Sequence, residues 1–204
     1  MKKHCLLLSF TITMFLSCTP PEQTDFTDTN DFQEFIELRW KINAEGSVSS
    51  SPCISDNVVY FGSAVSDIEN EGYLYAVETE TGKEKWRFKT KGEVHSTPAV
   101  SNGVVYFGCD DNYFYAVYTD TGKVKWRFQT WSNVRSVPLV ANGVVYFGGD
   151  DNYFYSIDAE TGLLKWKLKT LGAVSSSQYI VDNVIYFGSK SGYLYSVKLK
   201  TKSK

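Results

Sequence analysis

One sequence pattern is repeated four times along this chain of 204 residues. Each copy begins at Tyr-Phe-Gly, and the first three copies end in Thr-Gly followed by Trp four residues after the Gly. Trp86, Trp126 and Trp166 lie 40 residues apart, and Trp40 precedes Trp86 by 46 residues. A fixed period in this range is typical of solenoids, arrays and propellers, in which one copy cannot bury its own apolar face. We therefore expect the core to form between neighbouring repeats.

Each repeat contains four short strand signals separated by turn residues. In the second repeat, Ser101–Gly103 and Asp120–Gly122 supply a Gly for positive φ, and Asp111–Asn112 is a two-residue hairpin. The expected strands of this repeat are Val94–Val100, Val104–Gly108, Tyr113–Tyr118 and Val124–Gln129. Four antiparallel strands repeated every 40 residues predict an all-β propeller with four four-stranded blades.

The N-terminus has the features of a bacterial lipoprotein precursor. Lys2 and Lys3 precede a mostly apolar stretch that is too short to span a membrane. The stretch ends in Phe-Leu-Ser-Cys at Cys18, which resembles a lipobox, with Phe15 where Leu is usual. This resemblance implies a signal peptide over 1–17, lipid attachment at Cys18, a polar tether over 18–36 and a repeat domain over 37–204. The chain is then expected in the cell envelope as an outer-membrane lipoprotein facing the periplasm or the cell surface.

The charge of the chain excludes one class of partner. The net charge is −2, and removal of 1–17 leaves 19 basic and 23 acidic residues. Non-specific binding to nucleic acid needs a positive surface that displaces counterions from phosphates. No nucleic-acid partner is therefore expected.

The motifs of the repeat resemble those of the PQQ-like β-propeller family over residues 37–200. The resemblance implies that Trp40, Trp86, Trp126 and Trp166 dock between adjacent blades. It extends to the propeller lipoprotein of the outer-membrane β-barrel assembly machine, which has eight blades and is built from the same repeats. The family places an Asp before Thr-Gly, and only the third repeat has one, Asp158. Weaker hydrogen bonding between blades is therefore expected where Glu78, Tyr118 and Lys198 take its place.

The first and last strand signals are complementary. Leu38–Ile42 has the pattern of a fourth strand, whereas Tyr193–Leu199 has the pattern of a third strand. The N-terminal strand is therefore expected to complete the last blade. Two closures fit: a four-bladed ring within one chain, or a homodimer that forms an eight-bladed ring.

Few residues in the chain suggest catalysis. The family resemblance raises the possibility of a quinone-dependent dehydrogenase, and these enzymes use a pair of adjacent Cys residues. Cys53 and Cys109 are far apart in the sequence and do not form such a pair. They have no zinc-site spacing and are expected to be free thiols, with a bridge between neighbouring repeats as the alternative. Asp110–Asp111 and Asp150–Asp151 lack the spacing of a calcium loop and are interpreted as turns. The expectation is a protein with no enzymatic activity, no cofactor and no metal.

The loops between blades share one edge of the propeller with the loops between second and third strands, and binding residues collect on such loops. His95 is the only His after the signal peptide, and Trp131 is the one Trp outside the repeat pattern. The candidate partner-binding residues on this edge are Trp131, Arg135, His95, Asp67, Glu69 and Glu71. Three functions remain open: a protein-binding scaffold acting in outer-membrane protein assembly, a small-molecule or carbohydrate sensor at the channel mouth, and, least favoured, a quinone-dependent dehydrogenase.

Overall fold

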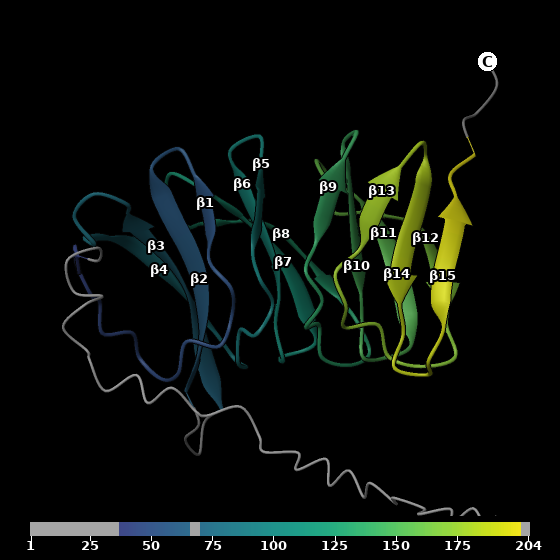
Figure 1. The fold of residues 1–204 in the computed structure, drawn as a ribbon, viewed down its shortest axis with the longest axis horizontal. Coiled ribbons are helices and arrows are strands. Elements are labelled where there is room, and N and C mark those ends of the chain that lie inside the picture. Colours follow the sequence, from purple (N-terminus) through teal and green to yellow (C-terminus); the bar gives the residue numbers. More distant parts are fainter. Residues whose placement is uncertain (1–36, 66–69, 201–204) are drawn as a thin grey trace, which may run out of the picture. The chain divides into compact units, whose positions relative to one another are not determined.

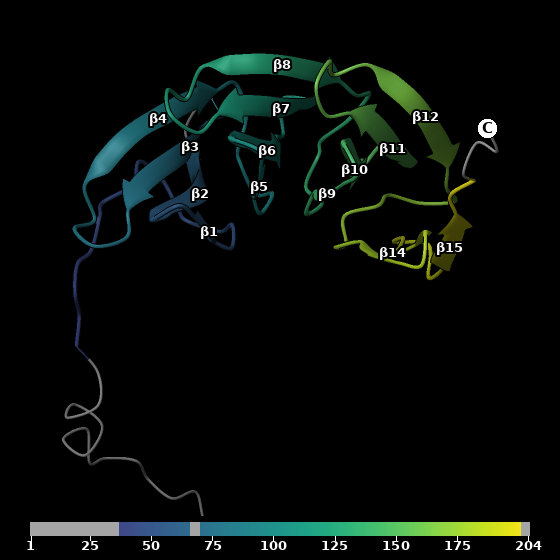
Figure 2. The same cartoon turned by 90° about the horizontal axis from the view of Figure 1, so that it is seen from above.

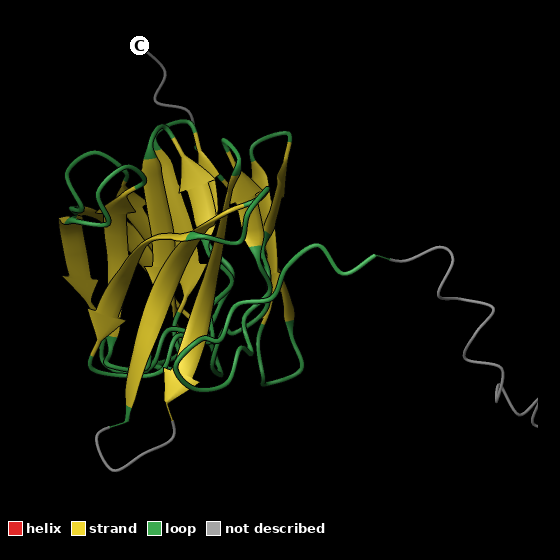
Figure 3. Ribbon diagram, turned by 90° about the vertical axis from the view of Figure 1, so that its left-hand side faces the viewer, coloured by secondary structure: helices red, strands yellow, loops and turns green. Residues whose placement is uncertain are grey.

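The computed structural model describes residues 37–65 and 70–200, of which those from Arg39 onward belong to one compact unit. These residues contain strands and loops but no helix (Figure 3). None of the described segments is therefore a helix that could cross a membrane. The proposed signal peptide, Cys18 and the tether lie outside the described residues, as do Asp67 and Glu69.

The described strands form antiparallel sheets in which neighbours in the sheet are neighbours in the chain (Figure 1). The first sheet contains β1 (Cys53–Ser55), β2 (Val58–Val65), β3 (Glu71–Glu78) and β4 (Glu84–Thr90). The second contains β5 (Ala99–Ser101), β6 (Val104–Gly108), β7 (Tyr113–Tyr118) and β8 (Val124–Gln129). The third contains β9 (Leu139–Ala141), β10 (Val144–Gly148), β11 (Tyr153–Asp158) and β12 (Leu164–Lys169). The last contains β13 (Tyr179–Val181), β14 (Val184–Gly188) and β15 (Leu194–Lys198).

Within the compact unit the sheets follow one another along an arc, with β4, β8 and β12 on its convex side (Figure 2). The core lies between the faces of successive sheets, as the repeat pattern predicts. Phe114 of the second sheet stacks on Phe147 of the third at 3.9 Å between ring centroids, and Phe154 stacks on Phe187 of the last sheet at 4.0 Å. These sheets are therefore the blades of a propeller, and the all-β fold expected from the sequence is confirmed.

The turn residues adopt the conformations that their types predict. Asn102 and Asn112 have φ of 50° and 67°, and Gly103 and Gly122 have φ of 73° and 65°. Asn and Gly are the residues that enter this left-handed region at least cost. The turn chemistry therefore sets the strand ends, and β6, β7 and β8 have the predicted bounds.

The innermost strand is shorter than the sequence predicts. A strand was expected over Val94–Val100, but β5 begins at Ala99. Pro98 has no N–H to give to a ladder. Ser96 donates its hydroxyl to the carbonyl of Ser136 in the next blade at 2.8 Å. The segment before β5 therefore bonds to both neighbouring blades, since the amide of Val94 also donates to the carbonyl of Ser63 in the preceding blade at 3.1 Å.

Three of the four repeated Trp residues bond to the neighbouring blade, whereas no such bond is seen for Trp166 of the last complete sheet among the described residues. The indole N–H groups of Trp40, Trp86 and Trp126 donate to the carbonyls of Thr79, Thr119 and Ala159 at 2.8, 2.9 and 3.0 Å. In each case the acceptor belongs to the turn of the following blade.

The bonds to the turns that contain Glu78 and Tyr118 are as short as the bond to the turn that contains Asp158, so the expected weakening is not seen at these two positions. The acceptors are backbone carbonyls, which any residue provides. Asp158 instead accepts hydrogen bonds from Glu160 and Thr161 inside its own turn. Bonds from Thr161 lower the pKa of this carboxyl. Where Glu78 replaces the Asp, its carboxylate accepts the hydroxyl of Thr81 at 2.7 Å.

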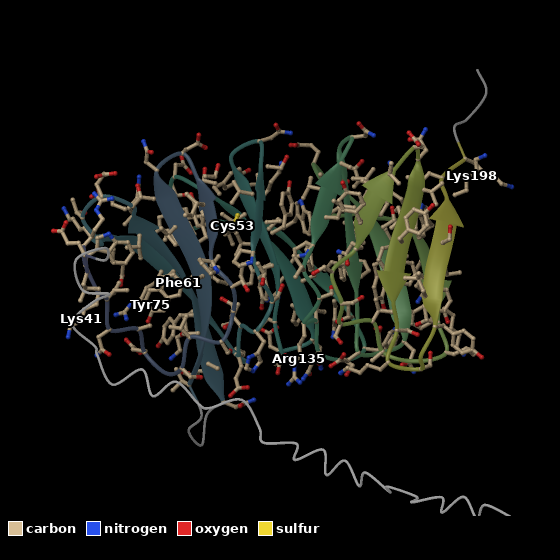
Figure 4. The ribbon with its side chains drawn as sticks, viewed as in Figure 1. Lys41, Cys53, Phe61, Tyr75, Arg135 and Lys198 are labelled. Carbon is tan, nitrogen blue, oxygen red and sulfur yellow. The ribbon has the colours of Figure 1, made fainter. Side chains whose placement is uncertain are left out.

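The last blade has three strands, because β15 pairs with β14 and with no other described strand. Residues 37–44 form no strand, although Trp40 occupies a docking position on the first sheet. The pairing of this segment with β15 within one chain is therefore not formed in the structure. Lys41 and Lys198 lie at opposite ends of the array of sheets (Figure 4).

Candidate functional site

The loops between blades meet the second-to-third-strand hairpins at one edge of the sheets. The amide of Asp110 donates to the carbonyl of Glu93 at 3.0 Å, and the amide of Asp150 donates to the carbonyl of Asn133 at 2.9 Å. We call this edge the rim face and define it by residues 91–95, 109–112, 131–135 and 149–152. Arg135 lies on it, at the lower edge of Figure 4.

Arg135 is held by Asp110, a residue that was interpreted from the sequence as part of a turn. Its Nε donates to the two carboxylate oxygens of Asp110 at 2.9 and 3.1 Å, and its Nη2 contacts Oδ2. The Asp110 side chain is 5% exposed, so its charge needs this partner. The hydrogen bond to Asp110 raises the pKa of Arg135. The two residues are 25 positions apart in different blades, and sequence spacing alone gives no signal of the pair.

The neighbouring residue Asp111 does have the turn role that the sequence predicts. Its Oδ1 accepts the amide of Tyr113 at 3.1 Å, and its Oδ2 accepts the hydroxyl of Tyr115 at 2.6 Å. Burial and this hydrogen bond raise the pKa of Tyr115. Asp151 makes the same contacts with Tyr153 and Tyr155 one repeat later. Both carboxylates thus bond within their own hairpins, and Asp151 also accepts the amide of Trp131.

His95 joins Arg135 on the rim face through a polar cluster. One ring nitrogen of His95 lies 2.7 Å from the hydroxyl of Ser49, and the other lies 2.8 Å from the carboxylate of Glu93. Ligand atoms of Glu93, His95 and Asp110 lie within 4.8 Å of one another. Because the charge of Asp110 is already balanced by Arg135, the cluster is better suited to hydrogen bonding with a polar partner than to holding a metal ion.

Trp131 lies in the same loop as Arg135, four residues earlier, with its indole in solvent. The residue is 83% exposed, the largest exposed fraction among the exposed large apolar residues. Its amide donates to Asp151 Oδ2 at 3.0 Å, and the preceding Thr130 donates its hydroxyl to the carbonyl of Ser132 at 2.7 Å. A hollow of about 170 Å³ lies against Gln129, Thr130 and Trp131. The loop backbone is therefore fixed while the aromatic ring is free to contact a partner.

Glu71 belongs to a different environment from Trp131, Arg135 and His95. It opens β3, and its carboxylate lies 2.6 Å from the ammonium of Lys89 on β4. The structure brings His95 and Arg135 together around Asp110, but it gives no contact between them and Glu71. Asp67 and Glu69, the other acidic candidates, fall in the part of the chain that is not described.

The two described cysteines are free thiols, as expected from their positions in the repeat. Cys109 is buried, and burial raises the pKa of its thiol. Burial raises the pKa of Cys53 as well. A raised pKa leaves little thiolate at neutral pH, so neither residue is suited to nucleophilic attack.

Antiparallel blades joined by hydrogen bonds from repeated Trp residues define the class of protein. The chain is a PQQ-like β-propeller. The family follows from the sequence profile described as outer membrane protein assembly factor BamB, which matches residues 70–203. The chain therefore belongs to this family. No curated protein matches it.

Solved structures agree with this fold. BamB from Moraxella catarrhalis is 22% identical with a TM-score of 0.68, and the match covers 78% of this chain and 49% of that one. The computationally designed protein Ika4 is 18% identical with a TM-score of 0.70. That match covers 81% of this chain and 99% of Ika4. Quinohemoprotein alcohol dehydrogenase from Comamonas testosteroni is 20% identical with a TM-score of 0.62, but only 29% of its length is covered, by 72% of this chain. The chain thus spans about half of the BamB structure.

Proposed function

We propose that this protein is a non-catalytic scaffold of the bacterial cell envelope that binds other proteins through its rim face. Its family contains an assembly factor for outer-membrane proteins, and we propose the same process for this chain. In this account Cys18 carries a lipid anchor and residues 18–36 form the tether, so that the propeller works at the outer membrane. Incorporation of labelled fatty acid into the wild-type chain, and its loss in Cys18→Ser, tests the anchor.

The observation that carries the binding proposal is the exposed Trp131 in the same loop as Arg135, which is paired with the buried carboxylate of Asp110. Aromatic residues and Arg are enriched where binding energy concentrates, because they bury a large area and keep a polar group. Arg135 is held in place by Asp110, and the Trp131 backbone is held by Asp151. Binding to such a fixed surface costs little ordering of side chains and loops.

A second function, a sensor for a carbohydrate or another small polar molecule, is favoured by the hydrogen-bonded cluster of Ser49, His95 and Glu93. The two proposals differ in the group that carries affinity. A sensor would lose its ligand when His95 is replaced and would tolerate loss of Trp131. A protein-binding scaffold would show the reverse order.

Trp131→Ala is expected to weaken binding to outer-membrane assembly proteins by about 2 kcal/mol, or roughly thirtyfold in Kd. Because the indole is 83% exposed, the melting temperature should stay within about 1 °C of wild type. The measurement is the affinity of the purified chain for these proteins, solubilised from the envelope in detergent. Leu163→Ala is the matched control, since Leu163 is 68% exposed in the hairpin at the opposite edge. Unchanged affinity in Trp131→Ala would contradict the proposal.

A further inference from the structure

Each of the first three sheets packs one face against the next sheet along the chain. In the last sheet the corresponding face is uncovered. Leu194 on β15 corresponds to Leu74, Phe114 and Phe154, which are all 0% exposed, yet Leu194 is 77% exposed. Tyr186 shows the same contrast, because it is 37% exposed and its counterpart Tyr106 is 2% exposed. In the preceding blades this face is the apolar surface that stacks on the next blade.

The first sheet carries the opposite feature, an outer segment that belongs to no sheet. Trp40 and Ile42 pack against the cluster of Phe61, Tyr75 and Val77 in the first sheet. Trp86 and Phe88 occupy the corresponding places between the first and second sheets, but they belong to the strand β4. Residues 40–42 therefore fill the position of an outer strand but belong to none of the described sheets.

We propose that a second copy of this chain fills both positions, so that two chains form one closed ring. The segment 40–43 of each copy remains docked on its own first sheet and pairs with β15 of its partner. The same contact then forms twice about a two-fold axis, and β15 of each copy gains a partner strand. The BamB match is consistent with this arrangement, because one copy covers 49% of that chain and two copies would supply about its full length.

The repeat fixes the register of the proposed pairing. In the second sheet Trp126 lies opposite Ala116, Phe128 opposite Phe114 and Gln129 opposite Tyr113. By the same spacing, Trp40 lies opposite Ser196 of the second copy, Ile42 opposite Leu194 and Asn43 opposite Tyr193. Leu194 would then stack on Phe61 of the second copy, as Phe114 stacks on Phe147 within one chain.

This register is tested by a pair of introduced cysteines, Asn43→Cys with Tyr193→Cys. Both positions are exposed, and Tyr193 is 57% exposed, so the changes should not disturb the blades. Residues directly opposite in an antiparallel pair have Cβ atoms about 4.5–5.5 Å apart, near enough for a disulfide after small adjustments. Mild oxidation of the full-length double variant should yield a covalent dimer on a non-reducing gel. A mixture of the two single variants should also yield it.

The matched control is the double variant Asn43→Cys with Tyr179→Cys. Tyr179 is 71% exposed on the inner strand β13, so this variant should give no dimer. Each single variant, oxidised by itself, shows how much disulfide forms between an introduced cysteine and Cys53. Two results would overturn the proposal. Loss of the introduced thiols without a dimer would mean closure within one chain, and thiols that stay free would mean no pairing. Should the variants fail to fold, the mass of the wild-type chain by light scattering in detergent decides between two copies and one.

Discussion

Phe114→Ala is expected to lower the free energy of unfolding by about 3–5 kcal/mol, the usual cost of truncating a buried Phe. Phe114 is 0% exposed and lies between the second and third blades, where its ring is 3.9 Å from that of Phe147. The change removes apolar area and an aromatic stack from a junction that neither blade can fill alone. Urea unfolding followed by tryptophan fluorescence measures the loss.

The control for this variant is Val124→Ala on the outer strand of the same blade. Val124 is 44% exposed, so its truncation should cost less than about 1 kcal/mol. Equal losses in the two variants would show that stability does not come from the junctions between blades.

Gly162→Ala should cost about 2–5 kcal/mol, from two additive causes. The residue has φ of +72°, a region where an L-residue is strained by about 1–2 kcal/mol. A Cβ at this position would also lie 2.7 Å from the Trp126 ring, and overpacking typically costs about 1–3 kcal/mol. The new methyl group should therefore displace the docked indole, which a blue or red shift of Trp fluorescence in the native state would report.

Gly143→Ala separates these two causes. Gly143 has nearly the same φ, +71°, but a Cβ there meets no atom within 4 Å. This variant should carry the backbone strain alone. If it is as unstable as Gly162→Ala, the close contact of Trp126 with the following turn contributes nothing, and the docking account is wrong.

The periodic residues were sufficient to predict the blades. Val104–Gly108 and Tyr113–Tyr118 alternate between two buried faces and end at Asn or Gly turns, so pattern and turn chemistry agree on each boundary. The innermost strand was predicted too long because the hydroxyl of Ser96 bonds to another blade. That competition depends on tertiary neighbours, which the local pattern does not contain.

The rim face was predicted less completely, for the same physical reason. Trp131, His95 and Arg135 stand out because they break the repeat, and the structure brings the last two together. Asp110 did not stand out, because it follows a common turn pattern and its partner lies in the next blade. Deviation from a repeat therefore identifies candidate binding residues, whereas the residues that position them become visible only when the blades are assembled.

The central claim, that the rim face binds envelope proteins, is tested most directly by photo-crosslinking in living cells. A photoreactive aromatic amino acid is placed at Trp131, and in a separate strain at Leu163, which is also well exposed but lies at the opposite edge. The account predicts adducts with outer-membrane assembly proteins from position 131 and none from position 163. The absence of adducts from position 131, or the same adducts from both positions, would contradict it.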